Sequence, residues 1–220
     1  MAKRPGAALT AAVDVRGAWA RLEAWFAAHR PDLDLTLRPP ATAKAIAAAE
    51  KKLGVALPAD FRESLLVHDG QENHPGVRII PYAMRLGSLA SLTACWKDDR
   101  ALFDEHEMRE RLEWLDDGRR VRQVHQHPKH VPIAGSPFWD YDRLLLDFAP
   151  GPRGTAGQVI ARDDVEVVFV CRSFGELLDK TARGLEVGAI TVEKSTDESR
   201  LVYRAAKSKK PVRPDVFFSR

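Results

Sequence analysis

Cysteine is scarce in this sequence, which contains only two in 220 residues. Cys95 and Cys171 lie far apart along the chain. They form neither the dense framework of a small disulfide-rich protein nor the paired spacing of a zinc site. A protein that does not depend on disulfides is typical of a reducing compartment. We therefore expect a cytoplasmic protein whose two thiols are reduced.

Long apolar runs are also missing. A membrane-spanning helix needs about 20 consecutive apolar residues, and no stretch of this chain approaches that length. Asp14 and Arg16 interrupt the alanines near the N-terminus, so we expect neither a signal peptide nor a membrane span. With 45% hydrophobic residues, the chain has enough apolar material for one sizeable core.

Negative charge is scarce at one end of the chain. Residues 194–220 contain eight Lys or Arg and three Asp or Glu, a local charge of +5, so the net charge of +3 leaves −2 for the rest. A basic segment can contact nucleic acid weakly. This one lacks a platform of aromatic rings for stacking bases, so we expect it mainly to be solvated.

These features predict three parts of the chain. The parts are an N-terminal extension over residues 1–14, a folded domain over 15–188 and a basic C-terminal tail over 189–220. Ile190–Val192 has the composition of an additional edge strand in this tail. Residues 205–214 are expected to be solvated, and nothing in the sequence fixes the oligomeric state.

The order of the expected helices and strands indicates an α+β fold. Short runs rich in Val, Ile, Leu and Phe, separated by Gly, Pro and Asp, predict an antiparallel meander of strands at 144–148, 158–161 and 165–170. Apolar periodicity and capping residues such as Thr42 and Gly54 predict the helices. These are expected at 14–29, 42–54, 57–69, 88–102, 108–115 and 174–185. We therefore predict a single domain with helices around a mostly antiparallel, mixed sheet.

Two segments carry residues that bind metals or phosphates in other proteins. His125, His127 and His130 supply an H-x-H pair without the further ligands of a zinc site. The glycine-containing loop at 151–157 lacks the Gly-Lys-Ser/Thr ending of a phosphate-binding loop and does not lead into a helix. We therefore predict no cofactor and no metal.

Three acids near the meander are the remaining candidates for chemistry. Asp140, Asp142 and Asp147 have no nucleophile–base pair beside them in the sequence. We predict no catalytic residues and a protein that is not an enzyme. A hydrolase that uses Asp140 and Asp142 is the alternative.

Three segments together resemble the SUKH superfamily, in the branch named after the yeast cell-wall assembly regulator (the SMI1/KNR4-like domain). The first is AEKKLGVALPADFRESLLVHDGQ at 49–71, with Leu-Gly, Leu-Pro, an acid before an aromatic residue and a closing Asp-Gly. The second is HPKHVPIA at 127–134. The third is LLLDFAPGPRGTAGQVI at 144–160, followed by SFGELL at 173–178. The resemblance covers about residues 15–188.

The resemblance implies a mixed sheet with helices packed around it and a role in binding rather than catalysis. Bacterial members of the superfamily act mainly as immunity proteins that neutralise toxins, and fungal members act as scaffolds in cell-wall signalling. We therefore predict an immunity-type protein that neutralises a toxin partner. A regulatory scaffold in cell-wall or envelope assembly is the alternative.

The chain departs from the family pattern at two positions. His130 stands where the family usually has Trp, and Ala149 stands where a second Asp is frequent. If these positions shape a binding site in the family, that site is expected to differ here.

The sequence also suggests where a protein partner binds. Two acids lie at the ends of the third predicted helix, and the loop 136–142 adds Trp139, Tyr141 and two further acids. The predicted partner-binding residues are Asp60, Asp69, Trp139, Asp140, Tyr141 and Asp142. An acidic rim with an aromatic anchor suits a basic partner, such as a nuclease toxin, because charge complementarity speeds and orients docking. The alternative for Asp60 and Asp69 is a structural role at a helix end or turn.

Overall fold

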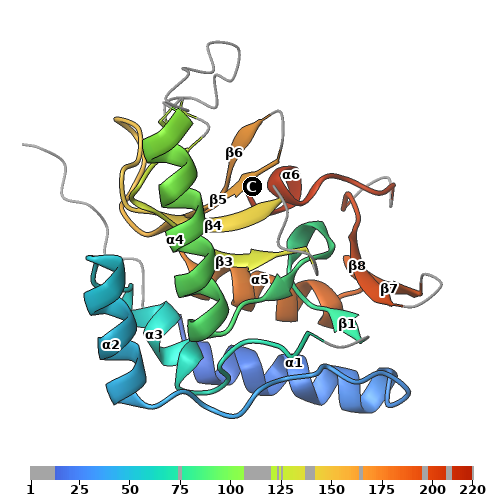
Figure 1. Ribbon diagram of the computed structural model, residues 1–220. Helices are drawn as coiled ribbons and strands as arrows, with labels where there is room; N and C mark the ends of the chain where they lie inside the picture. Colours follow the sequence, from blue (N-terminus) through green and yellow to red (C-terminus); the bar gives the residue numbers. More distant parts are fainter. Residues whose placement is uncertain are drawn as a thin grey trace, which may run out of the picture.

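The computed structural model describes residues 13–73, 76–106, 120–122, 124, 126–136, 142–163, 166–194, 198–206 and 210–219. It begins with three helices, α1 (Val15–His29), α2 (Ala43–Leu53) and α3 (Ala59–Leu65) (Figure 1). The hydroxyl of Thr42 accepts a hydrogen bond from the N–H of Ala45 at 3.1 Å, and Gly54 ends α2 with a φ of +67°. The predicted start and end of this helix are therefore confirmed.

Five strands form the central sheet, in the order β2-β3-β4-β5-β6, and all neighbouring pairs are antiparallel. They are β2 (Arg85–Leu86), β3 (His130–Gly135), β4 (Arg143–Asp147), β5 (Gln158–Arg162) and β6 (Val167–Cys171). The last three are the predicted meander, which is confirmed. The sequence did not indicate β2 and β3, because β2 has only two residues and Pro132 interrupts the pattern of β3 where the register shifts.

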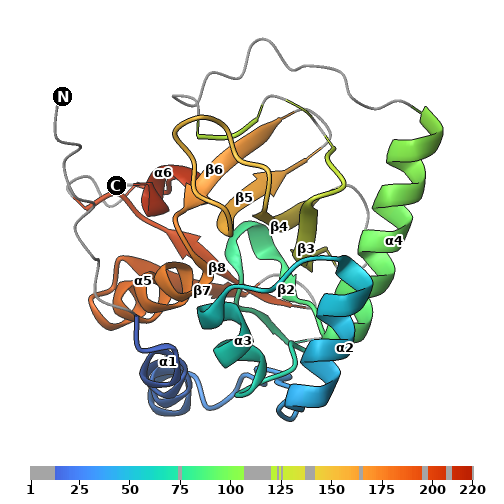
Figure 2. The ribbon, with the colours of Figure 1, turned by 90° about the vertical axis from the view of Figure 1, so that its left-hand side faces the viewer.

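Helices pack against this sheet from different sides. Helix α4 (Leu89–His106) packs against β3 and α2, whereas α5 (Phe174–Glu186) packs against β5, β6 and α1 (Figure 2). Aromatic residues of the N-terminal helices, among them Trp19 and Phe61, are buried in the core. The ring of Phe61 meets that of Phe174 edge to face at 5.0 Å, and the indole N–H of Trp19 donates to the hydroxyl of Ser64 at 2.9 Å. This core joins α1, α3 and α5.

A second sheet contains three strands in the order β1-β8-β7. They are β1 (Val77–Arg78), β7 (Ile190–Lys194) and β8 (Ser199–Tyr203), and a short 3-10 helix, η1 (Pro81–Ala83), follows β1. Strands β1 and β8 are parallel, whereas β7 and β8 are antiparallel. Strand β7 contains the predicted strand at 190–192 and lies at the edge. The α+β class, with helices around mostly antiparallel sheets in one domain, is confirmed.

The described end of the predicted tail is attached to the domain. Helix α6 (Pro214–Phe218) buries Phe218 against Tyr203, with ring centroids 5.4 Å apart. The ammonium group of Lys180 donates to the carbonyl oxygen of Phe218 at 2.6 Å, and the hydroxyl of Tyr82 donates to Asp215 at 2.9 Å. Apolar burial thus outweighs the positive charge that suggested full solvation. The division of the chain at residue 189 stays a prediction.

Gly70 and Gly54 form a matched pair for testing a close backbone contact after α3. Both have a positive φ, +76° and +67°, so alanine at either position costs about 1–2 kcal/mol of backbone strain. At Gly70 an added Cβ would also lie 2.5 Å from the backbone of Gly87, whereas at Gly54 it would meet nothing within 4 Å. We expect Gly70→Ala to lower the free energy of unfolding by about 2 kcal/mol more than Gly54→Ala in urea denaturation. Equal losses would contradict this packing.

Candidate functional site

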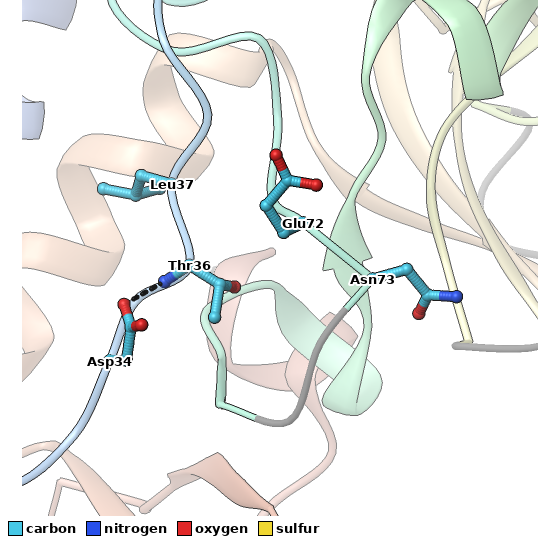
Figure 3. A pocket seen from close by; sticks show the side chains of 5 residues that line it. All are labelled: Asp34, Thr36, Leu37, Glu72 and Asn73. Atoms are coloured by element: carbon cyan, nitrogen blue, oxygen red, sulfur yellow. Dashed lines mark hydrogen bonds between the residues drawn. The ribbon is translucent and has the colours of Figure 1, made fainter.

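A polar cleft lies where the loop after α1 meets the segment after α3 (Figure 3). It consists of two adjoining cavities that share Glu72 and Asn73 in their walls. The larger cavity, of about 600 Å³, is also lined by Asp34, Thr36 and Leu37, which lie on the neighbouring segment. The smaller cavity, of about 160 Å³, has further polar lining residues from the loop after α1, the segment after α3, β2, the start of α4 and the segment after β3. These are Arg38, Gln71, Arg85, Ser88, Ser91 and Ser136.

Gln71 fixes the walls of the cleft. Its side chain is only 6% exposed and donates hydrogen bonds to the carbonyl oxygens of Leu35 at 2.7 Å and Val77 at 2.8 Å. Its backbone N–H donates to the carbonyl oxygen of Leu86 at 2.8 Å. One residue thereby joins the loop after α1 to β1 and β2. Because a buried carbonyl group without a donor is costly, these bonds determine how the three segments meet.

Thr36 has a strained conformation in the wall of the larger cavity. Its φ is +52°, which a β-branched residue rarely adopts. The conformation is held by two bonds of 2.7 Å, from the N–H of Thr36 to Asp34 and from the N–H of Glu72 to the carbonyl oxygen of Thr36. Its hydroxyl is buried and has no partner among the described residues, in a side chain 8% exposed. Strain and unsatisfied polar groups concentrate at functional sites, which makes the cleft the candidate site.

Positive charge is buried beside the smaller cavity. Arg85 is 7% exposed, and its guanidinium pairs with Glu198 and donates to Asn73 Oδ1 at 2.6 Å. Arg78 pairs with the same carboxylate, so two guanidinium groups share one Glu198. Burial lowers the pKa of Arg85, and the charge of Arg78 lowers it further. Burial also lowers the pKa of Arg78. Burial therefore disfavours the charged form of both guanidinium groups.

Asp60 and Asp69, which the sequence assigned to the partner-binding rim, both bind helix ends inside the protein. Asp60 Oδ2 accepts the N–H of Gly175 at 2.7 Å, in the first turn of α5. Asp69 Oδ1 accepts the N–H of Leu89, the first residue of α4, at 2.7 Å. In these positions a carboxylate satisfies an open amide and favours the positive end of the helix. Both acids therefore have the structural role that the sequence left open, and a role in partner binding stays a prediction.

Of the other predicted rim residues, the structure describes Asp142 alone. Trp139, Asp140 and Tyr141 lie outside the described residues, as does the predicted helix at 108–115. Asp142 is exposed directly before β4. The acidic rim therefore stays a prediction from the sequence.

The two departures from the family pattern meet at one buried carboxylate. Asp147 Oδ1 accepts the N–H of Ala149 at 2.8 Å and lies 3.6 Å from His130 Nε2. Asp147 Oδ2 accepts a hydrogen bond from Gln158 Nε2 at 2.9 Å. Asp147 is 0% exposed and His130 is 3% exposed. Both departures therefore lie at an internal network and not in the lining of the cleft.

The described residues show no arrangement for metal or thiol chemistry. Within these ranges no group of three or more His, Cys, Asp and Glu side chains is placed to hold a metal ion, and His125 lies outside them. Cys95 and Cys171 are free and buried. Burial raises the pKa of Cys95 to about 12, so this thiol stays protonated and is a poor nucleophile. No helix in the described part of the chain is both long enough and apolar enough to cross a bilayer.

Sequence reasoning missed four residues of the cleft and of the charge cluster beside it. These are Thr36, Arg78, Arg85 and Glu198. No local sequence pattern identifies them as site residues. They lie in four separate segments, namely the loop after α1, β1, β2 and the position before β8. Only Gln71 lay in a quoted motif, as the last residue of the segment 49–71.

The fold and the cleft define an α+β domain with a polar binding site. The profile of the SMI1 / KNR4 family (SUKH-1) matches residues 40–180, more than half of the chain. This protein therefore belongs to the SMI1 / KNR4 family, and the resemblance read from the sequence is confirmed. The matched range includes Gln71, Arg85 and Ser91, whereas Thr36 and Glu198 lie outside it.

Fungal regulators are among the relatives of this chain. It is 26% identical over 234 residues to "Cell wall assembly regulator SMI1" of Saccharomyces cerevisiae, covering 89% of this chain and 46% of the relative. It is 27% identical over 201 residues to "Cell wall biosynthesis/cell cycle regulator smi1" of Schizosaccharomyces pombe, covering 86% and 40%. It is 24% identical over 221 residues to "Glucan synthesis regulatory protein" of Neurospora crassa, covering 85% and 41%. The chain thus spans less than half the length of these relatives.

Substitutions at two adjacent positions test the role assigned to the Gln71 side chain. Gln71→Ala leaves the carbonyl oxygens of Leu35 and Val77 without these donors, and we expect a loss of about 2–3 kcal/mol in unfolding free energy. Glu72→Ala removes an exposed ion pair with Arg38 and should cost less than about 1 kcal/mol. Thermal unfolding of both variants gives the comparison. A Glu72 loss as large as that of Gln71 would contradict the assignment.

Proposed function

We propose that this protein is a non-enzymatic regulatory module of cell-wall or envelope assembly that acts by binding a protein partner. The observation that carries the proposal is similarity over 85–89% of the chain to proteins named as regulators of cell-wall assembly, cell-wall biosynthesis and glucan synthesis. This is the alternative of the two functions expected from the sequence. Because the chain spans less than half of each of these relatives, the module's role in a pathway is part of the proposal.

The polar cleft supports a binding role for the described domain. It combines a strained residue, Thr36, with a buried cation, Arg85, in the walls of adjoining cavities. Such features lower stability and are retained where they serve binding. A cytoplasmic location belongs to the same proposal, and the two free, buried thiols support it.

Complementation in the native host tests the proposed function. We expect deletion of the gene to increase sensitivity to wall-damaging agents, and the wild-type chain to restore growth. Asn73→Arg should fail to restore it, because this residue lines both cavities and a longer side chain would fill them. Lys52→Ala, an exposed change on α2 outside the cleft lining, is the control and should restore growth. Normal wall sensitivity of the deletion strain would count against this function.

Purification of the tagged full chain from the same host tests the kind of partner. Recovery of envelope-synthesis enzymes with the wild-type chain and the Lys52 control, but not with Asn73→Arg, would support regulation through the cleft. Equal recovery with all three would place the partner elsewhere on the protein.

Toxin neutralisation is the second candidate function. The family match favours it, because immunity-type binding is one of the roles that the family resemblance implies. Co-expression with toxin candidates from neighbouring genes should then rescue growth and yield a stable complex. Such a complex typically buries about 1,600 Å² in total. No rescue and no complex with any candidate would remove this function.

The predicted rim at Trp139 and Asp140 has its own test once a partner is isolated. A buried aromatic anchor costs about 2 kcal/mol or more of binding free energy when it is truncated, so Trp139→Ala should weaken the complex by that amount. Asp140→Lys should mainly slow association with a basic partner, and the effect should shrink at high salt. Unchanged affinity and rate for both variants, with folding intact, would place the interface elsewhere.

A further inference from the structure

Among the described residues, the arginine side chains around the smaller cavity outnumber the carboxylates that pair with them. Within that set, Arg78 and Arg85 share the carboxylate of Glu198. Arg38 pairs with Glu72, with Arg38 Nη1 and Glu72 Oε2 2.7 Å apart. These five described side chains carry a net charge of +1. A cation held away from water needs a compensating charge, so the cluster is suited to one more anion.

The nearby acids that the structure describes, Asp69 and Asp34, do not provide that anion. Asp69 binds the first amide of α4, where its charge is offset by the positive end of the helix. Asp34 lines the larger cavity instead, where it accepts the N–H of Thr36 at 2.7 Å. The excess charge therefore remains beside the smaller cavity.

Hydrogen-bond donors in the smaller cavity are not all used. A guanidinium group has five N–H donors. Arg85 uses Nη1 for Asn73 and Nη2 for Glu198, and its Nε has no partner among the described residues. The Nε of Arg38 has none there either. Ser88 and Ser91 add hydroxyl groups to the same lining. Guanidinium and hydroxyl donors together are the chemistry that binds carboxylate and phosphate oxygens.

We propose that the smaller cavity binds one oxyanion, a carboxylate or a phosphate group, carried by a side chain of the protein partner. This inference deepens the proposed function and rests on it for the identity of the carrier. The oxyanion lies against Arg85 and supplies the second negative charge that Arg78 and Arg85 lack. The exposed pair of Arg38 and Glu72 opens to admit it, since exposed ion pairs are weak.

The larger cavity accommodates the residues next to that side chain. It adjoins the smaller cavity at Glu72 and Asn73, and its volume of about 600 Å³ exceeds the 160 Å³ of the smaller one. The hydroxyl of Thr36, which is buried without a partner among the described residues, offers a hydrogen bond to a polar group placed there. Figure 3 shows Thr36 and Glu72 on the two segments that border this space.

Titration of the full chain with inorganic phosphate and, separately, with acetate tests the oxyanion site without any partner. We expect saturable changes in the amide NMR signals of residues 85–91 with at least one of the two anions. Saturation by phosphate alone identifies a phosphorylated side chain as the carrier. Saturation by acetate as well identifies an acidic side chain.

Three variants locate the site. Arg85→Gln should weaken anion binding about tenfold or more, because a charge-assisted hydrogen bond is lost. Ser91→Asp places a fixed carboxylate in the lining at the start of α4, where an acid favours the helix, and should abolish saturable binding with the fold intact. Arg62→Gln removes an exposed arginine on α3 and is the matched control, with wild-type binding expected. Linear shifts without saturation, or equal binding by all three variants, would overturn the site.

A lipid source is tested separately. Sedimentation of the full chain with vesicles of anionic phospholipid, lost in Arg85→Gln and kept in Arg62→Gln, would assign the anion to a lipid headgroup and overturn the protein carrier. No sedimentation supports the protein carrier. The phosphate and acetate titrations need no partner. Failure to purify a partner with the tagged chain therefore does not contradict the oxyanion site. A failed titration likewise leaves the regulatory function open to its own test.

Discussion

The buried side chain of Gln71 is the interaction on which the arrangement of this protein depends. It donates to two carbonyl oxygens in segments that are remote in sequence, while its backbone pairs with β2. Gly70, directly before it, has a positive φ and no room for a side chain beside Gly87. The turn after α3 is therefore fixed by contacts on both sides. The walls of the polar cleft follow from that turn.

Acidic side chains hold the first turns of helices in place by accepting hydrogen bonds from their backbone amides. Asp60 binds the start of α5 and Asp69 binds the start of α4, each from a different part of the chain. A helix leaves its first amides open, so a carboxylate supplied by another element both satisfies an amide and fixes the position of the helix. Acids that look available for a partner in the sequence thus stabilise the fold. This is why the charge of a residue alone is a weak guide to an interface.

The cleft concentrates features that lower stability. Thr36 has an unfavourable backbone conformation, and Arg78 and Arg85 share one carboxylate in partly desolvated surroundings. Each is tolerated because the surrounding hydrogen bonds hold the segments in place. In the function proposed above, these features serve the binding of a partner. The buried carboxylate of Asp147, by contrast, accepts hydrogen bonds from its neighbours inside the protein.

Local sequence patterns were enough to predict the α+β class, the helix beginning after Thr42 and ending at Gly54, and the meander β4-β5-β6. Each depends on local patterns, namely capping chemistry, apolar period and turn residues, which act over a few neighbouring residues. Three features became visible in the tertiary structure alone: the position of β2, the packing of α6 against the domain, and the existence of the cleft. The cleft and the charge cluster beside it combine Thr36, Arg85 and Glu198, which are far apart in the chain and carry no local signal. Their shared environment arises from packing between segments, because burial and charge pairing depend on which distant groups come together.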